Sequence, residues 1–267
     1  MKGPLSLLGV LALGGLFLAG LAHTVIQGLS PEAWARLATA SFARTGLFTL
    51  WYAGASALLA GILGTFLALA LPHGEHSLHA ASRLWLVLPP TSVAFLVILV
   101  LAPTGIVATI VSPGATWAGS PVRDELGLGM ITAAVIKETA FATLWVRSVL
   151  SSLDPRLVQT ARMLGASRLQ IFREVVGPVV WPASVTASLM VFVYALGSWE
   201  IPWMLGPSTP QTLSIMVYNA REHGDAGDRA AAAAVLTLLA AVSALAAWLV
   251  LGRKGRNGAA PNPEVLP

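Results

Sequence analysis

Lys137, Glu138 and Glu200 are charged residues in apolar stretches of the chain, where an ionised side chain is costly. Lys137 and Glu138 are adjacent in the stretch 128–150, and Glu200 lies near the end of the stretch 180–204. If these stretches cross a membrane, such side chains face protein or water rather than lipid. Adjacent helix positions do not share a face, so Lys137 and Glu138 are predicted to pair with different neighbouring helices. All three are candidates for a substrate pathway, and a purely structural pairing between helices is the alternative for Lys137 and Glu138.

Three histidines between the second and third apolar stretches have a spacing that could collect a metal ion. His73, His76 and His79 recur at every third residue, and Glu75 lies among them. Metal sites need three or four such ligands held on a framework. This segment is short and polar, so a solvated loop is the better interpretation, and no metal site is predicted.

The sequence lacks the patterns that nucleophilic catalysis and ATP binding require. A serine hydrolase could be imagined from Ser56 or Ser198 with His23. Only the residue types support it, since no Gly-x-Ser-x-Gly elbow is present. Cysteine is absent, which removes thiol nucleophiles and cysteine-ligated zinc. The phosphate-binding pattern Gly-x-x-x-x-Gly-Lys-Ser/Thr does not occur. We therefore expect a chain that is not an enzyme and carries no cofactor of its own.

The composition shows what kind of elements must position these residues. Apolar residues make up 56% of the 267 positions and charged residues only 10%, well below the charged fraction of soluble domains. Several charge-poor stretches approach the roughly 20 residues that span a hydrocarbon core of about 30 Å. The sequence thus predicts an all-α, polytopic membrane protein with a single transmembrane domain over 1–251 and a short disordered tail over 252–267. The six predicted spans are 5–26, 47–71, 84–111, 128–150, 180–204 and 230–251.

Charge also orients the spans. The net charge is +4, but the basic residues form no single patch, so no nucleic-acid partner is predicted. An even number of spans puts both termini on one side. If that side is cytoplasmic, most basic residues fall inside, as the positive-inside rule requires, and the acidic residues Glu222, Asp225 and Asp228 fall outside. We expect both termini to be cytoplasmic.

Prolines and glycines modify individual spans. Pro89 and Pro90, and later Pro103, are predicted to kink or break the third span. Gly61 and Gly64 in the second span favour close contacts between helices.

The segment 154–178, predicted to lie inside the cell, is patterned as two short amphipathic helices. Asp154 followed by Pro155 is an N-cap with proline at the first helical position. Gly165 can supply the left-handed residue that ends this first helix. Its apolar face is formed by Leu157, Ala161 and Leu164.

The second helix of this segment opens at a capping box. Ser167 and Gln170 have the spacing, and we expect the helix to stop at Gly177 and Pro178. A loop that only joins two spans needs a handful of residues, so a patterned, arginine-rich segment indicates that something binds there. Docking of a protein and adsorption to anionic lipid are both compatible with a basic amphipathic element.

This segment resembles the EAA loop of ABC importer permeases, whose pattern is Glu-Ala-Ala, a spaced glycine, then Ile-x-Leu-Pro. The sequence departs from the pattern at Gln159 for the glutamate, Thr160 for the first alanine, Val175 for isoleucine and Gly177 for leucine, and it keeps the spacing. The residues that carry the resemblance are Gln159-Thr160-Ala161, Leu164-Gly165-Ala166-Ser167, Gln170-Ile171-Phe172, Val175-Val176 and Gly177-Pro178.

The resemblance implies a permease of the bacterial cytoplasmic membrane whose loop is a coupling helix, seated in a cleft of an ATPase subunit. It implies four partners: an ABC ATPase dimer that binds ATP and magnesium, a second permease subunit, identical or homologous, a periplasmic or lipid-anchored substrate-binding protein, and membrane lipid. The residues that it assigns to the ATPase contact are Gln159, Thr160, Ala161, Gly165, Ala166, Ser167, Phe172 and Pro178.

A second stretch bears on the substrate. Residues 197–207 with Gln211-Thr212-Leu213 resemble the polyamine, iron(III) and thiamine branch of these permeases. The resemblance implies import of a polyamine, iron(III) or another small solute, and a carboxylate at Glu200 would attract a cation. A stand-alone channel or a secondary transporter is the alternative function, although neither needs a basic two-helix segment.

Overall fold

The regular secondary structure is helical in the residues that the computed structural model describes, which are 4–70, 85–114 and 116–257, with side chains described between 13 and 249. The predicted all-α class is confirmed. In chain order the elements are α1 (Pro4–Gly28), α2 (Pro31–Leu37), α3 (Ala40–Ala70), α5 (Pro90–Leu101), α6 (Ile106–Val111), α7 (Leu128–Leu150), α8 (Pro155–Met163), α9 (Arg168–Ile171), the π-helical turn η1 (Phe172–Val176), α10 (Gly177–Gly197), α11 (Glu200–Leu205), α12 (Leu213–His223) and α13 (Ala226–Asn257).

The membrane-spanning arrangement agrees with the prediction. The first predicted span is a bent pair, in which Leu13–Gly28 meets α2 at an angle of 66°, and this pair counts as a sixth span if taken together. Five further helical stretches of the described chain are long and apolar enough to cross a membrane, namely Ala40–Ala70, Pro90–Val111, Leu128–Leu150, Arg168–Gly197 and Ala226–Leu249.

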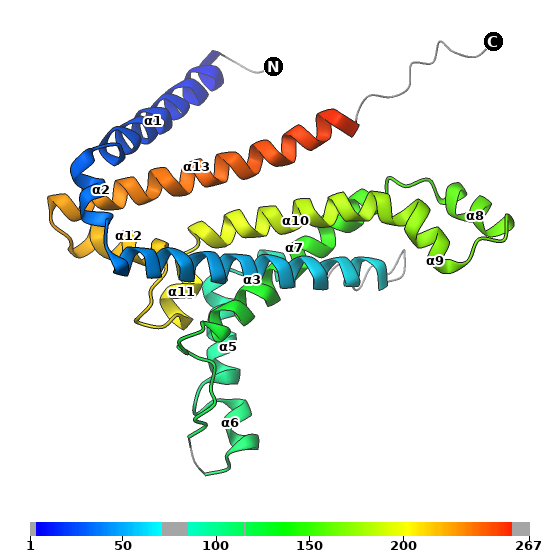
Figure 1. The fold of residues 1–267 in the computed structure, drawn as a ribbon, viewed down its shortest axis with the longest axis horizontal. Coiled ribbons are helices and arrows are strands. Elements are labelled where there is room, and N and C mark those ends of the chain that lie inside the picture. Colours follow the sequence, from blue (N-terminus) through cyan, green and yellow to red (C-terminus); the bar gives the residue numbers. More distant parts are fainter. Residues whose placement is uncertain (1–3, 71–84, 115, 258–267) are drawn as a thin grey trace.

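Prolines break the third span at the predicted places. α5 begins at Pro90, because proline needs no N–H partner in the first turn of a helix. It ends at Leu101, shortly before Pro103, and the chain becomes helical again in α6 after Gly105. α5 packs against α7 and α11, and α6 extends from it away from the other helices (Figure 1).

The fifth span differs from the prediction at both ends. Its helix starts before residue 180 and ends at Gly197 rather than at 204, and α11 is a separate short helix. Pro202 explains the break, because its ring would clash with the carbonyl of Ser198 in a continuous helix. Ser198 is instead extended, and the hydroxyl of Ser214 donates to its carbonyl at 2.8 Å.

The last helix extends beyond the predicted domain boundary. The tail was expected to be disordered from residue 252, yet α13 continues through Asn257. Arginine and lysine, which occupy 253, 254 and 256, are good helix formers, and the helix continues through them although Gly252 and Gly255 weaken it. Residues 258–267 lie outside the described residues.

α3 packs against α7 and α10 at the centre of the bundle. Glycines permit the close approach that the sequence predicts. A side chain at Gly61 would clash with Ser188 of α10, and one at Gly64 would clash with Ala142 of α7. The main apolar core lies around the first half of α3, where Tyr52 is fully buried.

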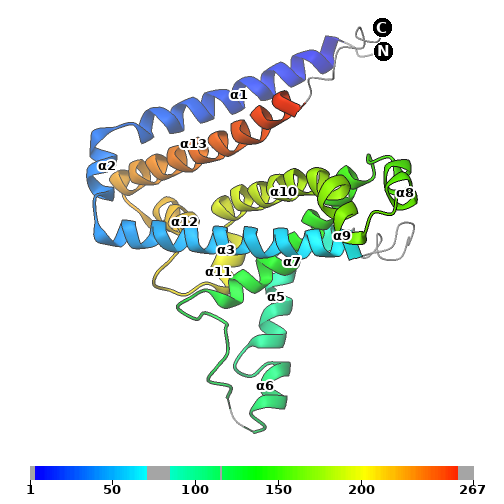
Figure 2. The same ribbon diagram turned by 45° about the vertical axis from the view of Figure 1, so that its right-hand side comes forward.

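α1 and α13 lie side by side as a second layer, which α2 and α12 join to the first (Figures 1 and 2). Arg36 of α2 reaches the start of α13, with its Nη1 3.1 Å from Asp225 and 3.3 Å from Asp228. α8 and α9 lie at the opposite end of the bundle, and the first turn of α1 and the last turn of α13 point towards that side (Figure 1). The molecule therefore has an α8–α9 end and an α2–α12 end.

Candidate functional site

The 154–178 segment begins as predicted. The Asp154 carboxylate accepts from the backbone N–H of Arg156 at 2.9 Å, and Pro155 is the first helical residue of α8. Gly165 has a φ of +80°, in the left-handed region where a Cβ is unfavourable. The N–H of Ala166 donates to the carbonyl of Ala161 at 3.0 Å, and that of Gly165 donates to Arg162 at 3.0 Å. This is a Schellman closure, so the helix ends because of Gly165.

The second helix opens as predicted but does not stop where the sequence indicated. The capping box is complete, since Gln170 N–H donates to Ser167 Oγ at 3.3 Å and Ser167 N–H donates to Gln170 Oε1 at 2.8 Å. α9 then passes through the π turn η1 directly into α10, and Gly177 N–H donates to the carbonyl of Phe172. The wider π turn moves the carbonyls away from the Pro178 ring, which therefore fits in the first turn of α10 instead of ending the helix.

Apolar side chains of this segment are uncovered. Leu164 is 82% exposed and Met163 is 80% exposed. Ile171 is the only buried residue of α8 and α9. An apolar surface of this kind marks a contact with a protein or a membrane. Of the residues assigned to the ATPase contact, Ala161 and Ala166 are half-buried, and the exposed ones are Gln159, Thr160, Gly165, Ser167, Phe172 and Pro178.

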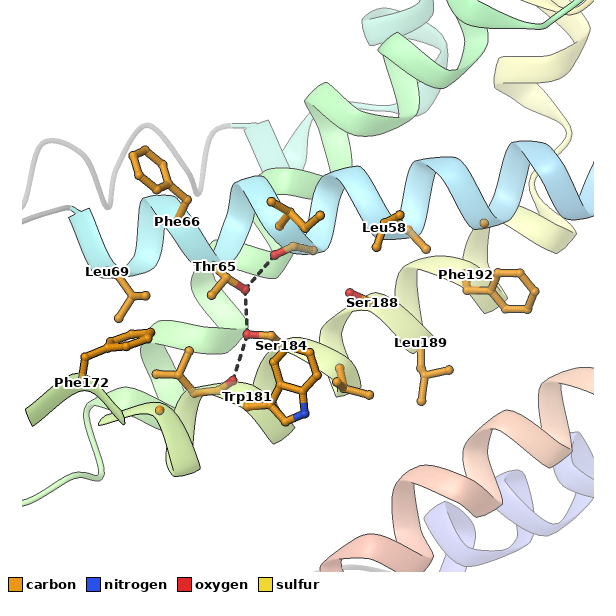
Figure 3. Close-up of a pocket in the computed structure, with 17 residues that line it drawn as sticks. Leu58, Thr65, Phe66, Leu69, Phe172, Trp181, Ser184, Ser188, Leu189 and Phe192 are labelled. Carbon is orange, nitrogen blue, oxygen red and sulfur yellow. Dashed lines mark hydrogen bonds between the residues drawn. The ribbon is translucent and has the colours of Figure 1, made fainter. Parts of the chain in front are cut away.

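An open groove of about 930 Å³ continues from the segment along the bundle, between α3 and α10 (Figure 3). Phe172 and Gly177 line its start, so the groove and the 154–178 segment share residues. Its lining is mostly apolar, and the hydroxyls of Thr65 and Ser184, 2.7 Å apart, bridge the two helices. Its remaining walls include Gly54, Leu58, Phe66, Trp181, Leu189 and Phe192.

The two adjacent charges of α7 pair with each other, contrary to the prediction. Lys137 Nζ lies 3.1 Å from Glu138 Oε1, and their side chains are only 12% and 8% exposed. The lysine chain is long and flexible enough to reach around the helix, and burial strengthens the attraction between the charges. Lys137 also lies over the ring of Tyr194, with 5.1 Å from Nζ to the ring centroid.

Glu200 belongs to the same group of side chains. Its Oε2 lies 3.4 Å from Ser198 Oγ. The side chains of Tyr52 and Tyr194 lie near Ser198 and within electrostatic range of Glu138 and Glu200. The structure thus brings the three predicted pathway residues together in one charge cluster, which we define as Tyr52, Lys137, Glu138, Tyr194, Ser198 and Glu200.

The tyrosines of the charge cluster were missed in the sequence. Tyr52 and Tyr194 come from α3 and α10, while the charges come from α7 and α11. One signal was available, because the chain has three tyrosines in all and two of them lie in apolar spans. Ser56 Oγ and Thr139 Oγ1 are also buried, with no hydrogen-bond partner among the described residues.

The weaker candidates are not assembled into sites. His23 bonds Gln27 of its own helix at 3.1 Å and lines a cavity that includes neither Ser56 nor Ser198. The serine–histidine pairing is therefore not present. The histidine segment, His73, Glu75, His76 and His79, lies outside the described residues. Among the described residues, no group of three or more metal-ligating side chains could hold an ion.

Comparison with known proteins identifies the chain. The family described as "Binding-protein-dependent transport system inner membrane component" matches residues 60–252, from the middle of α3 into the last turns of α13. The chain belongs to this family. It is the permease of a binding-protein-dependent ABC importer and spans the inner membrane, which sets aside the channel and secondary-transporter alternatives. The 154–178 segment falls within the matched residues, as do the charge cluster except Tyr52 and the groove lining except Gly54, Ala57 and Leu58.

Relatives of this importer permease include two proteins named for molybdenum. The chain is 26% identical over 174 residues to a putative molybdenum transport system permease protein of Bacillus subtilis, covering 63% of this chain and 74% of that protein. It is 24% identical over 188 residues to the molybdenum transport system permease protein ModB of Azotobacter vinelandii, covering 69% and 81%.

Solved structures share the permease fold. A bacterial ABC transporter involved in the import of the acidic polysaccharide alginate matches with a TM-score of 0.66 at 20% identity, covering 95% of this chain and 99% of that one. The alginate ABC transporter in complex with a pentasaccharide-bound periplasmic protein matches with a TM-score of 0.71 at 21% identity, covering 95% of both chains. At these identities the likeness concerns the fold alone.

Proposed function

We propose that this importer permease is driven by a separate ABC ATPase dimer that docks on the 154–178 segment. The observation that carries the proposal is the helical path Arg168–Gly197, which joins the exposed α9 to the wall of the groove without an intervening loop. A displacement imposed on α9 is thereby passed to α10 and to the groove. ATP and magnesium are bound by the ATPase subunits, and this chain binds neither.

Charge and apolar area together favour a protein as the occupant of this segment. Arg156, Arg162, Arg168 and Arg173 are exposed and have no ion-pair partner within the described residues. They lie in the same segment as the uncovered Met163 and Leu164. Exposed apolar side chains accompanied by arginines are typical of a protein interface.

A copurification experiment tests the docking. We expect Leu164→Asp to reduce the ATPase retained by the tagged permease at least about tenfold, because a charge in a desolvated contact costs more than 1.4 kcal/mol. Leu29→Asp is the matched control, since Leu29 is 65% exposed at the opposite end of the molecule. Equal retention by both variants and the wild type would show that the ATPase does not contact Leu164.

We further propose that a second permease subunit covers the α3–α10 groove and completes the substrate pathway. The groove is open along the side of a single chain, and its small residues permit a close approach by another helix. Gly54 lines it, and a Cβ at this position would meet nothing within 4 Å. The open space is available to a partner.

The substitution Gly54→Leu tests this covering. We expect the variant to fold normally and to lose most of its association with the partner permease, because the added side chain fills the space that the partner needs. The control is Gly46→Leu, which also projects from α3 into open space but lies outside the groove. The measurement is pull-down of a differently tagged second subunit; normal recovery with Gly54→Leu would place the partner elsewhere.

The proposed orientation puts the α8–α9 end and both termini in the cytoplasm. The α2–α12 end then faces outward, where a periplasmic or lipid-anchored binding protein delivers substrate. The charge cluster carries one positive and two negative formal charges, from Lys137, Glu138 and Glu200, so it favours a small cation such as a polyamine or iron(III) over an anion. Uptake of a labelled diamine and of molybdate by the assembled importer, with its binding protein, separates the two classes.

A further inference from the structure

A polar cavity of about 670 Å³ lies at the α2–α12 end, away from both the groove and the charge cluster. The cavity is formed where α1 meets the connection between α12 and α13. The helices α1 and α13 lie side by side in both views (Figures 1 and 2). The residues that line it are His23, Thr24, Gln27, Ser30, Arg221, Ala226, Arg229 and Ala230.

The charged lining of this cavity is positive. Arg221 and Arg229 contribute two guanidinium groups, and neither has an ion-pair partner within the described part of the chain. Glu222, although next to Arg221 in the sequence, does not line the cavity. Two unpaired arginines at one cavity favour an anion with several oxygen acceptors, which a guanidinium binds through parallel hydrogen bonds.

The nearby carboxylates are committed elsewhere. Asp225 Oδ1 accepts from the Asp228 N–H at 2.7 Å, and Asp228 Oδ2 accepts from the Asp225 N–H at 3.2 Å. Both also bond Arg36. The hydrogen bond from the Asp228 backbone, followed by the charge of Arg36, holds the pKa of Asp225 below its ordinary value. Asp225 and Asp228 thus keep Arg36 and the start of α13 together and leave Arg221 and Arg229 unneutralised.

The cavity also offers neutral donors. Ser30 Oγ accepts from the Ala33 N–H at 3.4 Å, which leaves the hydroxyl proton of Ser30 free to be donated. Gln27 and His23, whose side chains are 3.1 Å apart, also line the cavity. These groups match the remaining oxygen atoms of a phosphate.

An apolar cavity of about 490 Å³ adjoins the polar one between α1 and α13. Thr24 lines both cavities. The apolar cavity extends along α1 from Val25 back to Leu16, which is about 14 Å along the helix axis towards the membrane interior. The other lining residues are Phe17, Gly20, Leu21, Leu236, Thr237 and Ala240. A positively charged cavity that continues into an apolar one fits a ligand with an anionic head and an apolar tail.

We propose that the joined cavities bind a phospholipid with an anionic headgroup. Its phosphate lies between Arg221 and Arg229, and one acyl chain follows the α1–α13 seam. The bound lipid is distinct from the transported solute and from the coupling contact. The lipid fills the seam between α1 and α13. Its headgroup lies at the end where α2 and α12 hold these two helices to the rest of the bundle.

Native mass spectrometry of the full-length chain in detergent tests the proposal with three probes: phosphatidylglycerol, phosphatidylcholine and inorganic phosphate. We expect phosphatidylglycerol to be retained at least about tenfold more tightly than phosphatidylcholine, and the variant Arg221→Gln/Arg229→Gln to lose this preference. Arg44→Gln removes an exposed arginine elsewhere and should leave the preference unchanged.

A second variant distinguishes lipid from free anion. Gly20 lines the apolar cavity and a Cβ there would meet nothing within 4 Å, so Gly20→Leu places an added side chain in the space of the acyl chain. We expect it to weaken phosphatidylglycerol retention at least about fivefold, since the acyl chain loses buried area. The proposal is overturned if phosphatidylcholine is retained equally, if the arginine variant keeps the preference, or if inorganic phosphate binds through the arginines while Gly20→Leu has no effect on phosphatidylglycerol.

Discussion

Replacement of Gly165 by valine is expected to uncouple ATP hydrolysis from transport while leaving the permease in the membrane. Gly165 has a φ of +80° and closes α8 through two backbone hydrogen bonds. A β-branched residue in this conformation costs about 1–3 kcal/mol. The segment makes few contacts with the rest of the chain, so the turn relieves the strain by changing shape, and the docking surface changes with it.

The measurement is ATP-dependent uptake by the reconstituted importer, which should fall at least about tenfold. Gly114→Val is a closely matched control, because Gly114 has a φ of +77° and also meets nothing within 4 Å, but lies after α6 and outside the 154–178 segment. It carries the same backbone cost at another place. Equal loss of uptake in both variants would trace the defect to general strain and contradict a specific role for Gly165 in coupling.

Loss of one member of the buried ion pair is expected to be the most destabilising single change in the charge cluster. Lys137→Met leaves Glu138 without its charged partner in a site where its side chain is 8% exposed. Removing one partner of a buried pair typically costs about 3–5 kcal/mol, because the remaining charge is uncompensated. The measurement is thermal unfolding of the purified permease, with the retained folded fraction at growth temperature as a second readout.

The double variant Lys137→Met/Glu138→Gln separates structure from function. It removes both charges, so it should recover most of the lost stability. If the charge cluster contacts substrate, uptake stays low in this stable variant. Full recovery of uptake together with stability would show that the pair is structural. A stable Lys137→Met would contradict the uncompensated-charge argument itself.

Local signals in the sequence were sufficient to predict most helix ends. The N-cap Asp154, the left-handed Gly165 and the capping box of Ser167 act through contacts within a few residues, so their outcome does not depend on the fold. The breaks at Pro90 and Pro103 follow from the same local chemistry. The composition of the spans predicted the membrane fold for a similar reason, because lipid leaves an unpaired backbone no alternative to helices.

Predictions from the sequence were wrong where two local rules conflict or where a tertiary contact determines which side chains meet. Pro178 is a helix breaker by rule, but a π turn accommodates it. Lys137 and Glu138 should face apart, yet burial brings them together. Tyr52 could not be assigned to the charge cluster, because its neighbours come from helices distant in sequence.

The imperfections of the Arg168–Gly197 path are confined to the half nearest α9, which contains η1, Pro178 and Pro182. Bending is concentrated there, since those positions lack regular backbone hydrogen bonds. From Pro182 to Gly197 the helix is an uninterrupted rod about 24 Å long. A swing of about 10° at its base would carry its tip about 4 Å, more than the width of a water molecule. A modest rotation at the α8–α9 end is therefore sufficient to open or shut a passage beside the charge cluster.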